Sequence, residues 1–143
     1  MKIELINPQI GEPTLVALCG SVECGFPSPA QEYTAEELDL NHLLLKNKTA
    51  TFFAWARGLS MKNAGIDDGD LLVIDKSLTP QNNSITICMI DGEFTCKRIS
   101  CSDDGRLFLI PDNADFKRIE VKEGNNFAVW GVVTSWIKFA HRK

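Results

Sequence analysis

From residue 51 onward the chain is a series of short apolar segments, several of which end at a turn-forming pair or a proline. Asp91-Gly92 is a strong two-residue hairpin signal, and Asp104-Gly105 marks a second turn. Gly131 indicates a bend or bulge within the last segment. Short strands with turns between them favour a mainly β fold, either a curved antiparallel sheet or a partly open barrel. The expected strands are residues 51–56, 71–75, 84–90, 93–97, 106–110 and 127–137.

The first 30 residues have a different composition, because four of the six prolines in the chain lie there. This composition excludes long helices and favours extended backbone. We therefore interpret residues 1–24 as an N-terminal arm and residues 25–38 as an extended linker, followed by a domain at residues 39–143. Residues 14–18 have strand composition but stand isolated among breakers. The domain opens with a short helix over residues 39–46, capped by Asp39 and with Leu40, Leu43 and Leu44 on one face.

Charge and cysteine content limit the classes of function. The formal net charge is −4, which argues against DNA phosphates as the main source of binding energy, and we expect no sequence-specific DNA binding. The chain has no signal-peptide core and no segment that could span a bilayer, so we expect no membrane association. The five cysteines match no disulfide or zinc spacing. We expect reduced thiols, no metal, no cofactor and a cytoplasmic location.

One serine and one lysine are placed where they could support nucleophilic catalysis. Ser60 lies two residues after Gly58, just beyond the first expected strand. Lys97 lies on the expected strand that follows the Asp91-Gly92 turn. A serine hydroxyl needs a base, and neither His42 nor His141 is well placed. A lysine acts as a base only in its neutral form, which burial favours. Serines in turns and lysines on strands are common, so the chemistry alone leaves this pair a candidate.

Two further features belong to the same hypothesis. Backbone N–H groups of Ser60 and Met61, at the turn after Gly58, could stabilise an oxyanion. The pair Cys24-Gly25 stands before a proline-containing stretch, and extended backbone is what a protease cleft can bind as an added strand. The same pair also fits an ordinary linker.

These features occur in an order that resembles the LexA-like self-cleaving serine peptidases, whose members cut an Ala-Gly or Cys-Gly bond with a Ser–Lys dyad. The resemblance runs from about residue 20 to the C-terminus, and it implies a LexA- or signal-peptidase-like fold. It also implies that Ser60 is the nucleophile, Lys97 the general base and Cys24-Gly25 the bond that is cut. The matching stretches are Cys24-Gly25-Phe26-Pro27-Ser28-Pro29-Ala30, Asp39-Leu40-Asn41, Gly58 with Ser60-Met61, Gly69-Asp70-Leu71-Leu72 and Asp91-Gly92-Glu93-Phe94-Thr95 with Lys97.

The family also implies partners. In its members of this size, RecA filaments on single-stranded DNA promote self-cleavage during the SOS response. The shortened homodimer then joins the catalytic subunit of an error-prone translesion DNA polymerase. A homodimer is also expected from the apolar final segment, which includes Trp130, Val132 and Trp136 and which we interpret as an edge strand available for pairing.

Three other interpretations were weighed. A repressor of the LexA or phage type needs a helix-turn-helix domain, for which 24 residues before the cleavage site are too few. A signal peptidase also uses a Ser–Lys pair, but it needs a membrane anchor, and we find no segment in this sequence that could span a bilayer. A non-catalytic dimeric binding module of the same fold stays open because Leu59 stands where the family usually has an acidic residue before the serine.

Overall fold

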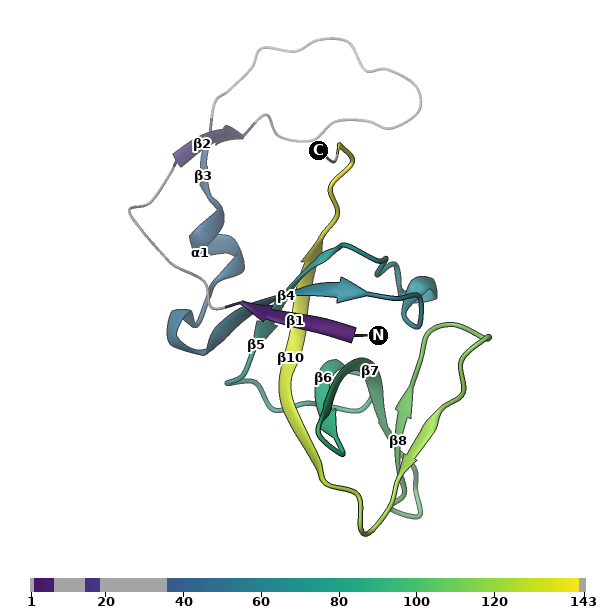
Figure 1. The fold of residues 1–143 in the computed structure, drawn as a ribbon. Coiled ribbons are helices and arrows are strands. Elements are labelled where there is room, and N and C mark those ends of the chain that lie inside the picture. The colour runs from purple at the N-terminus through teal and green to yellow at the C-terminus, as the bar shows by residue number, and fades with distance from the viewer. Residues whose placement is uncertain (1, 7–14, 19–35, 142–143) are drawn as a thin grey trace.

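The structure is a computed structural model that describes residues 2–6, 15–18 and 36–141 (Figure 1). Its main feature is one curled, half-barrel antiparallel sheet, which confirms the predicted mainly β fold class. A smaller sheet pairs β2 (Leu15–Leu18) with β3 (Glu36–Asp39). In spatial order the described strands of the large sheet are β1 (Lys2–Ile6), β4 (Thr51–Arg57), β5 (Leu71–Asp75), β10 (Phe127–Ile137), β6 (Ile85–Ile90), β7 (Glu93–Cys101), β8 (Leu107–Ile110) and β9 (Ile119–Val121).

The long strand β10 lies in the middle of this sheet, between β5 and β6. The prediction that this segment is an edge strand is therefore wrong, since both of its edges are paired within one chain. Its register shifts between Val129 and Gly131, which confirms the expected bulge. A Cβ atom at Gly131 would lie 2.5 Å from the Cγ2 atom of Ile74. Glycine thus lets β10 bend closely over β5.

The hydrophobic core lies within the curl of the sheet. Leu72, Ile74 and Ile87 are fully buried members from strands, and the turn after β4 adds Met61 and Ile66. Trp136 packs against this cluster and donates a hydrogen bond from its indole N–H to the carbonyl of Gly65, at 3.0 Å. The turn after β4 is thereby held by the core.

The helix α1 spans Leu40–Leu44, and the Asp39 side chain accepts a hydrogen bond from the Asn41 N–H. This confirms the helix and its cap, although the helix is shorter than predicted. The leucine face is not buried in the described structure, because Leu40 and Leu43 are 53% and 51% exposed. A helix of one and a half turns has little surface to bury. The chain instead buries Leu45, the residue that ends it. Two short 3₁₀ helices cover Lys48–Ala50 (η1) and Lys62–Ala64 (η2).

The N-terminal residues show two pairings that the sequence did not predict. β1 pairs with β4 from Lys2 opposite Arg57 to Ile6 opposite Phe53. β2, which we expected to be isolated, has β3 as its partner. Both pairings join segments far apart in the chain, and local composition contains no signal for such partners. The division at residues 24 and 38 stays a prediction, since residues 19–35 lie outside the described structure.

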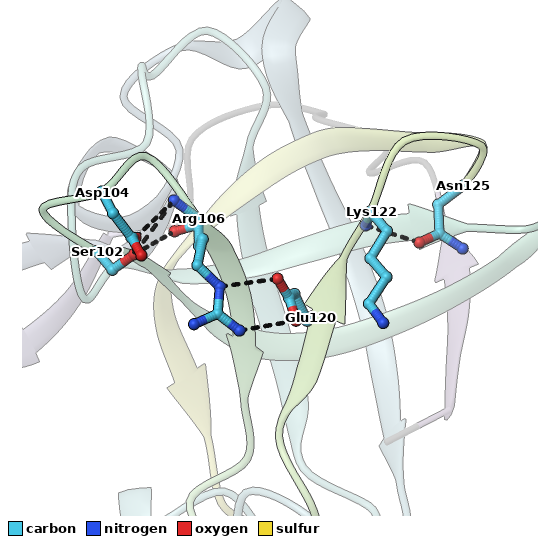
Figure 2. A network of polar contacts seen from close by, with 6 residues as sticks. All are labelled: Ser102, Asp104, Arg106, Glu120, Lys122 and Asn125. Carbon is cyan, nitrogen blue, oxygen red and sulfur yellow. Dashed lines mark hydrogen bonds and ion pairs between the residues drawn. The ribbon is translucent and has the colours of Figure 1, made fainter.

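β8 and β9 are the last two strands in the order of the large sheet, and Figure 2 shows polar contacts of these strands and their turns. Arg106 donates two hydrogen bonds to the Glu120 carboxylate, at 2.9 and 3.0 Å. Ser102 and Asp104 close the turn before β8, and the Asn125 side chain accepts a hydrogen bond from the Lys122 N–H after β9. These exposed contacts hold the three-residue strand β9, which was not predicted.

Candidate active site

Ser60 lies in a tight turn that begins where β4 ends. Gly58 has a φ of 101°, which glycine adopts without strain, and its N–H donates a hydrogen bond of 2.8 Å to the Asp68 carboxylate. The turn then leads into η2, and Met61, the residue that caps η2, belongs to the core cluster. Ser60 is only 1% exposed. The turn therefore places the Ser60 side chain below the protein surface.

Lys97 lies on β7 and projects toward this turn. Its ammonium nitrogen, Nζ, is 3.0 Å from the Ser60 hydroxyl oxygen, and the residue is 6% exposed. Nζ also lies 2.9 Å from the Thr95 hydroxyl and 3.2 Å from the Cys96 carbonyl oxygen. The structure therefore brings together the two residues predicted as nucleophile and base, although they are 37 positions apart in the chain. Their catalytic roles remain a prediction.

The three oxygen atoms around Lys97 Nζ limit how the hydrogens of the amine and of the Ser60 hydroxyl can be arranged. A protonated lysine donates to all three oxygens, and the Ser60 hydroxyl then has no base. A neutral amine has two hydrogens and one lone pair. When its two hydrogens go to the Cys96 carbonyl, which can only accept, and to the Thr95 hydroxyl, the lone pair is left facing Ser60. In this form the Ser60 O–H donates to Nζ, which is the geometry that general base catalysis requires.

Two cysteine thiols, Cys88 on β6 and Cys96 on β7, interact electrostatically with Lys97. Burial raises the pKa of the Cys96 thiol to about 12 and also raises that of the Cys88 thiol, although the Thr86 hydroxyl opposes the second shift. Both thiols are therefore neutral near Lys97. Thr86 donates from its hydroxyl to the Lys97 carbonyl, at 3.1 Å, which holds the strand at this residue. The two cysteines therefore place no negative charge beside the Lys97 amine.

The structure also shows contacts that sequence analysis missed. Thr95 had no predicted role, whereas its hydroxyl contacts Lys97 Nζ directly. Asp68, which also had no predicted role, accepts a hydrogen bond from the Gly58 N–H. Asn113, which follows β8, donates from its side-chain amide to the Leu59 carbonyl at 2.8 Å. Such contacts depend on tertiary structure, and no spacing rule in the sequence could reveal them.

The acidic turn at residues 65–70 is held by a buried carboxylate and by ion pairs. Asp70 is fully buried, accepts a hydrogen bond from the Asp67 N–H at 2.8 Å and forms an ion pair with Lys138. Lys138 pairs with Asp67 as well, at 2.7 Å. The end of β10 is thus joined to the turn that follows Ser60. In the described part of the chain no group of histidine, cysteine and acidic residues has the arrangement of a metal site.

The other predicted site residues are placed as follows. Met61 is fully buried beside Ser60, and the use of these two N–H groups for an oxyanion stays a prediction. Cys24 and Gly25 lie outside the described residues. His42 on α1 and His141 after β10 both have exposed side chains. In the described structure no helix has the length and apolar character needed to cross a membrane.

A cavity of about 390 Å³ lies elsewhere, between α1 and the end of β5. Burial opposes ionisation of its Asp75 carboxyl, but hydrogen bonds from Ser77 and Asn47 outweigh that effect and lower the pKa of Asp75. These hydrogen bonds join the segment before β4 to the end of β5. A structural role is therefore sufficient to explain the buried Asp75 carboxylate. The residues that line the cavity are Leu43, Leu44, Lys46, Asn47, Thr51, Asp75, Leu78, Thr134 and Ser135.

Comparisons with known proteins add a family relationship to this geometry. The sequence model of the family described as Peptidase S24-like matches residues 17–134. Protein ImpA of Salmonella typhimurium is 43% identical over 112 residues, which cover 78% of this chain and 75% of ImpA. Protein SamA of Salmonella typhimurium strain LT2 is 44% identical over 113 residues, with 79% and 77% covered. The LexA repressor of Bordetella parapertussis is 32% identical over 135 residues, with 94% of this chain and 61% of the repressor covered.

Proposed function

The chain belongs to the Peptidase S24-like family and is UmuD-like, and from this premise we propose that it is a self-cleaving serine peptidase with a Ser60–Lys97 dyad. One observation carries the proposal: the buried 3.0 Å contact between the Ser60 hydroxyl and Lys97 Nζ. Two buried polar side chains of these types in direct contact are costly to desolvate, and a structural role alone needs no such pair.

The geometry supports a two-step mechanism. Neutral Lys97 takes the Ser60 proton as the hydroxyl oxygen attacks the carbonyl carbon of residue 24, and backbone N–H groups at the turn hold the oxyanion. The Cys24–Gly25 bond then breaks, and Lys97 returns the proton to the amine of Gly25. Water, deprotonated by the same lysine, hydrolyses the acyl-enzyme and restores Ser60. Thr95 and the Cys96 carbonyl orient the amine in every step.

The proposal extends to the biological role of the cut. Removal of residues 1–24 leaves a chain that begins at Gly25, in keeping with the predicted arm, linker and domain. RecA on single-stranded DNA is the stimulus in this proposal, and the product is a homodimer that joins the catalytic subunit of a translesion DNA polymerase in the SOS response. These partners act in the bacterial cytoplasm. Likeness to UmuD-like relatives supports this part, since β10 no longer supports the dimer.

Leu59 does not favour an inert binding module. Its side chain is exposed and its backbone carbonyl is held by two hydrogen bonds, from Asn113 and from the Lys62 N–H. An acidic residue at this position would change a group that faces solvent. The contact between Ser60 and Lys97 is intact next to it.

The proposal is tested by a cleavage time course. Purified chain is incubated with RecA, a slowly hydrolysed ATP analogue and single-stranded DNA, and intact mass is recorded. We expect a product that begins at Gly25, and no product from Ser60→Ala or Lys97→Ala. Ser100→Ala and Lys62→Ala serve as matched controls outside the dyad and should cleave normally. A product that begins elsewhere, or none from the unsubstituted chain, contradicts the proposal.

A further inference from the structure

The segment after β8 forms hydrogen bonds to residues that are next to, or near, each member of the candidate dyad in the chain. Asn113 donates from Nδ2 to the Leu59 carbonyl at 2.8 Å, and its Oδ1 accepts from the Asp115 N–H at 3.0 Å. Because a backbone N–H can only donate, Oδ1 must face Asp115. The amide NH₂ of Asn113 therefore faces Leu59, the residue that precedes the nucleophile.

The Leu59 carbonyl belongs to the same peptide unit as the Ser60 N–H. This unit is planar and trans, so its C=O and N–H point in opposite directions. The carbonyl is held from two sides, by Asn113 and by the Lys62 N–H at 3.1 Å. Fixing the carbonyl direction also fixes the direction of the Ser60 N–H. That N–H is one of the two groups expected to bind the oxyanion.

The neighbouring residue, Asp112, extends the connection to the strand that carries the base. Its carbonyl accepts from the Asn63 N–H at 2.7 Å, and its carboxylate pairs with Arg98 Nε at 2.6 Å. Arg98 directly follows Lys97 on β7. The Asp112-Asn113 dipeptide therefore lies between the turn that holds Ser60 and the strand that holds Lys97, with hydrogen bonds to each.

We propose that Asn113 is a positioning residue for the self-cleavage reaction, which aims the Ser60 N–H at the developing oxyanion through its hydrogen bond to the Leu59 carbonyl. The inference rests on the proposed function. Asn113 touches none of the atoms that react, and Lys97 keeps its three oxygen contacts without it. Loss of the Asn113 donor should therefore lower the rate of the chemical step and leave the protonation of the base unchanged.

Asn113→Asp separates this role from a structural one. The substitution keeps the shape and the Oδ1 acceptor for the Asp115 N–H, but it turns an oxygen toward the Leu59 carbonyl. We expect the cleavage rate at its high-pH plateau to fall by about tenfold to a hundredfold, since complete loss of one oxyanion donor costs about 10²- to 10³-fold. The midpoint of the pH–rate curve should not move. Asn113→Ala, which removes the donor without adding repulsion, should show a smaller fall with the same midpoint.

Asn125→Asp is the matched control, because Asn125 has the same kind of contacts at another turn (Figure 2). Its Oδ1 accepts from the Lys122 N–H and its Nδ2 donates to Asp91, both at 2.9 Å. This variant should lose some thermal stability and cleave at the unsubstituted rate. The full chain is used throughout, with intact mass for the rate and thermal melting for stability.

The outcomes separate the two claims. If the unsubstituted chain cleaves while Asn113→Asp and Asn113→Ala cleave at its plateau rate, the positioning role is overturned and the proposed function stands. A shift in the midpoint of the pH–rate curve of either Asn113 variant also overturns the positioning role. So does a loss of cleavage rate in Asn125→Asp that equals the loss in Asn113→Asp at the same decrease in melting temperature. An unsubstituted chain that never cleaves overturns the proposed function, and this inference with it.

Discussion

At the level of single residues, the proposed catalysis depends on whether Lys97 Nζ carries two or three hydrogens. Lys97 Nζ has three oxygen neighbours, and only the neutral amine leaves a lone pair for the Ser60 hydroxyl. The Thr95 hydroxyl is therefore as much a part of the arrangement as the Cys96 carbonyl. It holds the amine in the rotamer that faces Ser60.

Thr95→Val tests this contact, because it keeps the β-branched shape and removes the hydroxyl. We expect self-cleavage to slow by about tenfold or more, in line with the rate loss that follows when a reacting group is displaced by about 1 Å. Thr95→Ser restores the hydroxyl and should recover most of the rate. Intact mass after fixed times at alkaline pH measures both variants. Equal rates for Thr95→Val and the unsubstituted chain would remove Thr95 from the account.

The described cysteines give a second prediction at this scale. Cys88 and Cys96 are buried and Cys101 is exposed. Because burial raises the pKa of Cys96 to about 12 and also raises that of Cys88, iodoacetamide at pH 8 should label Cys101 first. Labelling of the other two should require unfolding. Peptide mass mapping reads each site, and Cys96 labelled as fast as Cys101 would contradict the burial of the dyad's surroundings.

At the scale of elements, the sequence predicted those strands whose signals are local. β5 and β10 begin and end where alternation and turn residues placed them, and the Asp91-Gly92 turn joins β6 to β7 as expected. β1 and β3 were not predicted, because they are short and depend on partners distant in the chain, and β9 was missed because it has only three residues. Position within the sheet was also beyond the sequence, since an apolar strand such as β10 fits a centre or an edge equally well.

In the candidate site, too, the features with local sequence signals were predicted and those that depend on tertiary contacts were not. Ser60 and Lys97 could be found because each stands next to a local signal, a glycine turn and a hairpin. Their contact, and the roles of Asp68 and Asn113, arise only when β4, β7 and the segment after β8 meet. A sequence shows which residues could be a nucleophile or a base. The residues that orient those side chains can come from any part of the fold, so the sequence does not identify them.

Gly131→Ala tests the close approach of β10 to β5. The new methyl would lie 2.5 Å from Ile74 Cγ2, and Ile74 is fully buried, so the core must shift. We expect a loss of about 1–3 kcal/mol in the free energy of unfolding, as for other overpacked cores. Urea denaturation measures it. Adding Ile74→Ala should relieve the clash, so the double variant should lose less stability than the sum of the two single variants. Strict additivity would mean that the two positions do not meet.

At the scale of the whole molecule, buried charge makes stability depend on pH. The pKa of Asp75 is lowered from its ordinary value of 3.8, because hydrogen bonds from Ser77 and Asn47 outweigh the opposing effect of burial. A group with a lowered folded pKa contributes stability that is present above the unfolded value and is lost as pH falls through the folded value. Part of the acid sensitivity of the fold should therefore originate at the end of β5.

Asp75→Asn tests this origin. The variant should be less stable than the unsubstituted chain at pH 7, and the difference should shrink as pH falls below about 4. Thermal melting at a series of pH values measures the effect. Asp103→Asn, an exposed carboxylate in a turn, is the control and should leave the pH dependence unchanged. A constant difference between Asp75→Asn and the unsubstituted chain at every pH would show that the loss is not electrostatic.

Self-cleavage of the whole chain through the Ser60–Lys97 dyad is tested by the pH dependence of the unstimulated cleavage rate. Intact mass should show that the unsubstituted chain is cut between Cys24 and Gly25, at a rate that climbs with pH and levels off as the Lys97 amine becomes neutral. Lys97→Ala and Ser60→Ala should stay intact at every pH and remain folded. A Lys97→Ala chain that cleaves at the unsubstituted rate, or a rate that falls as pH rises, would contradict the account.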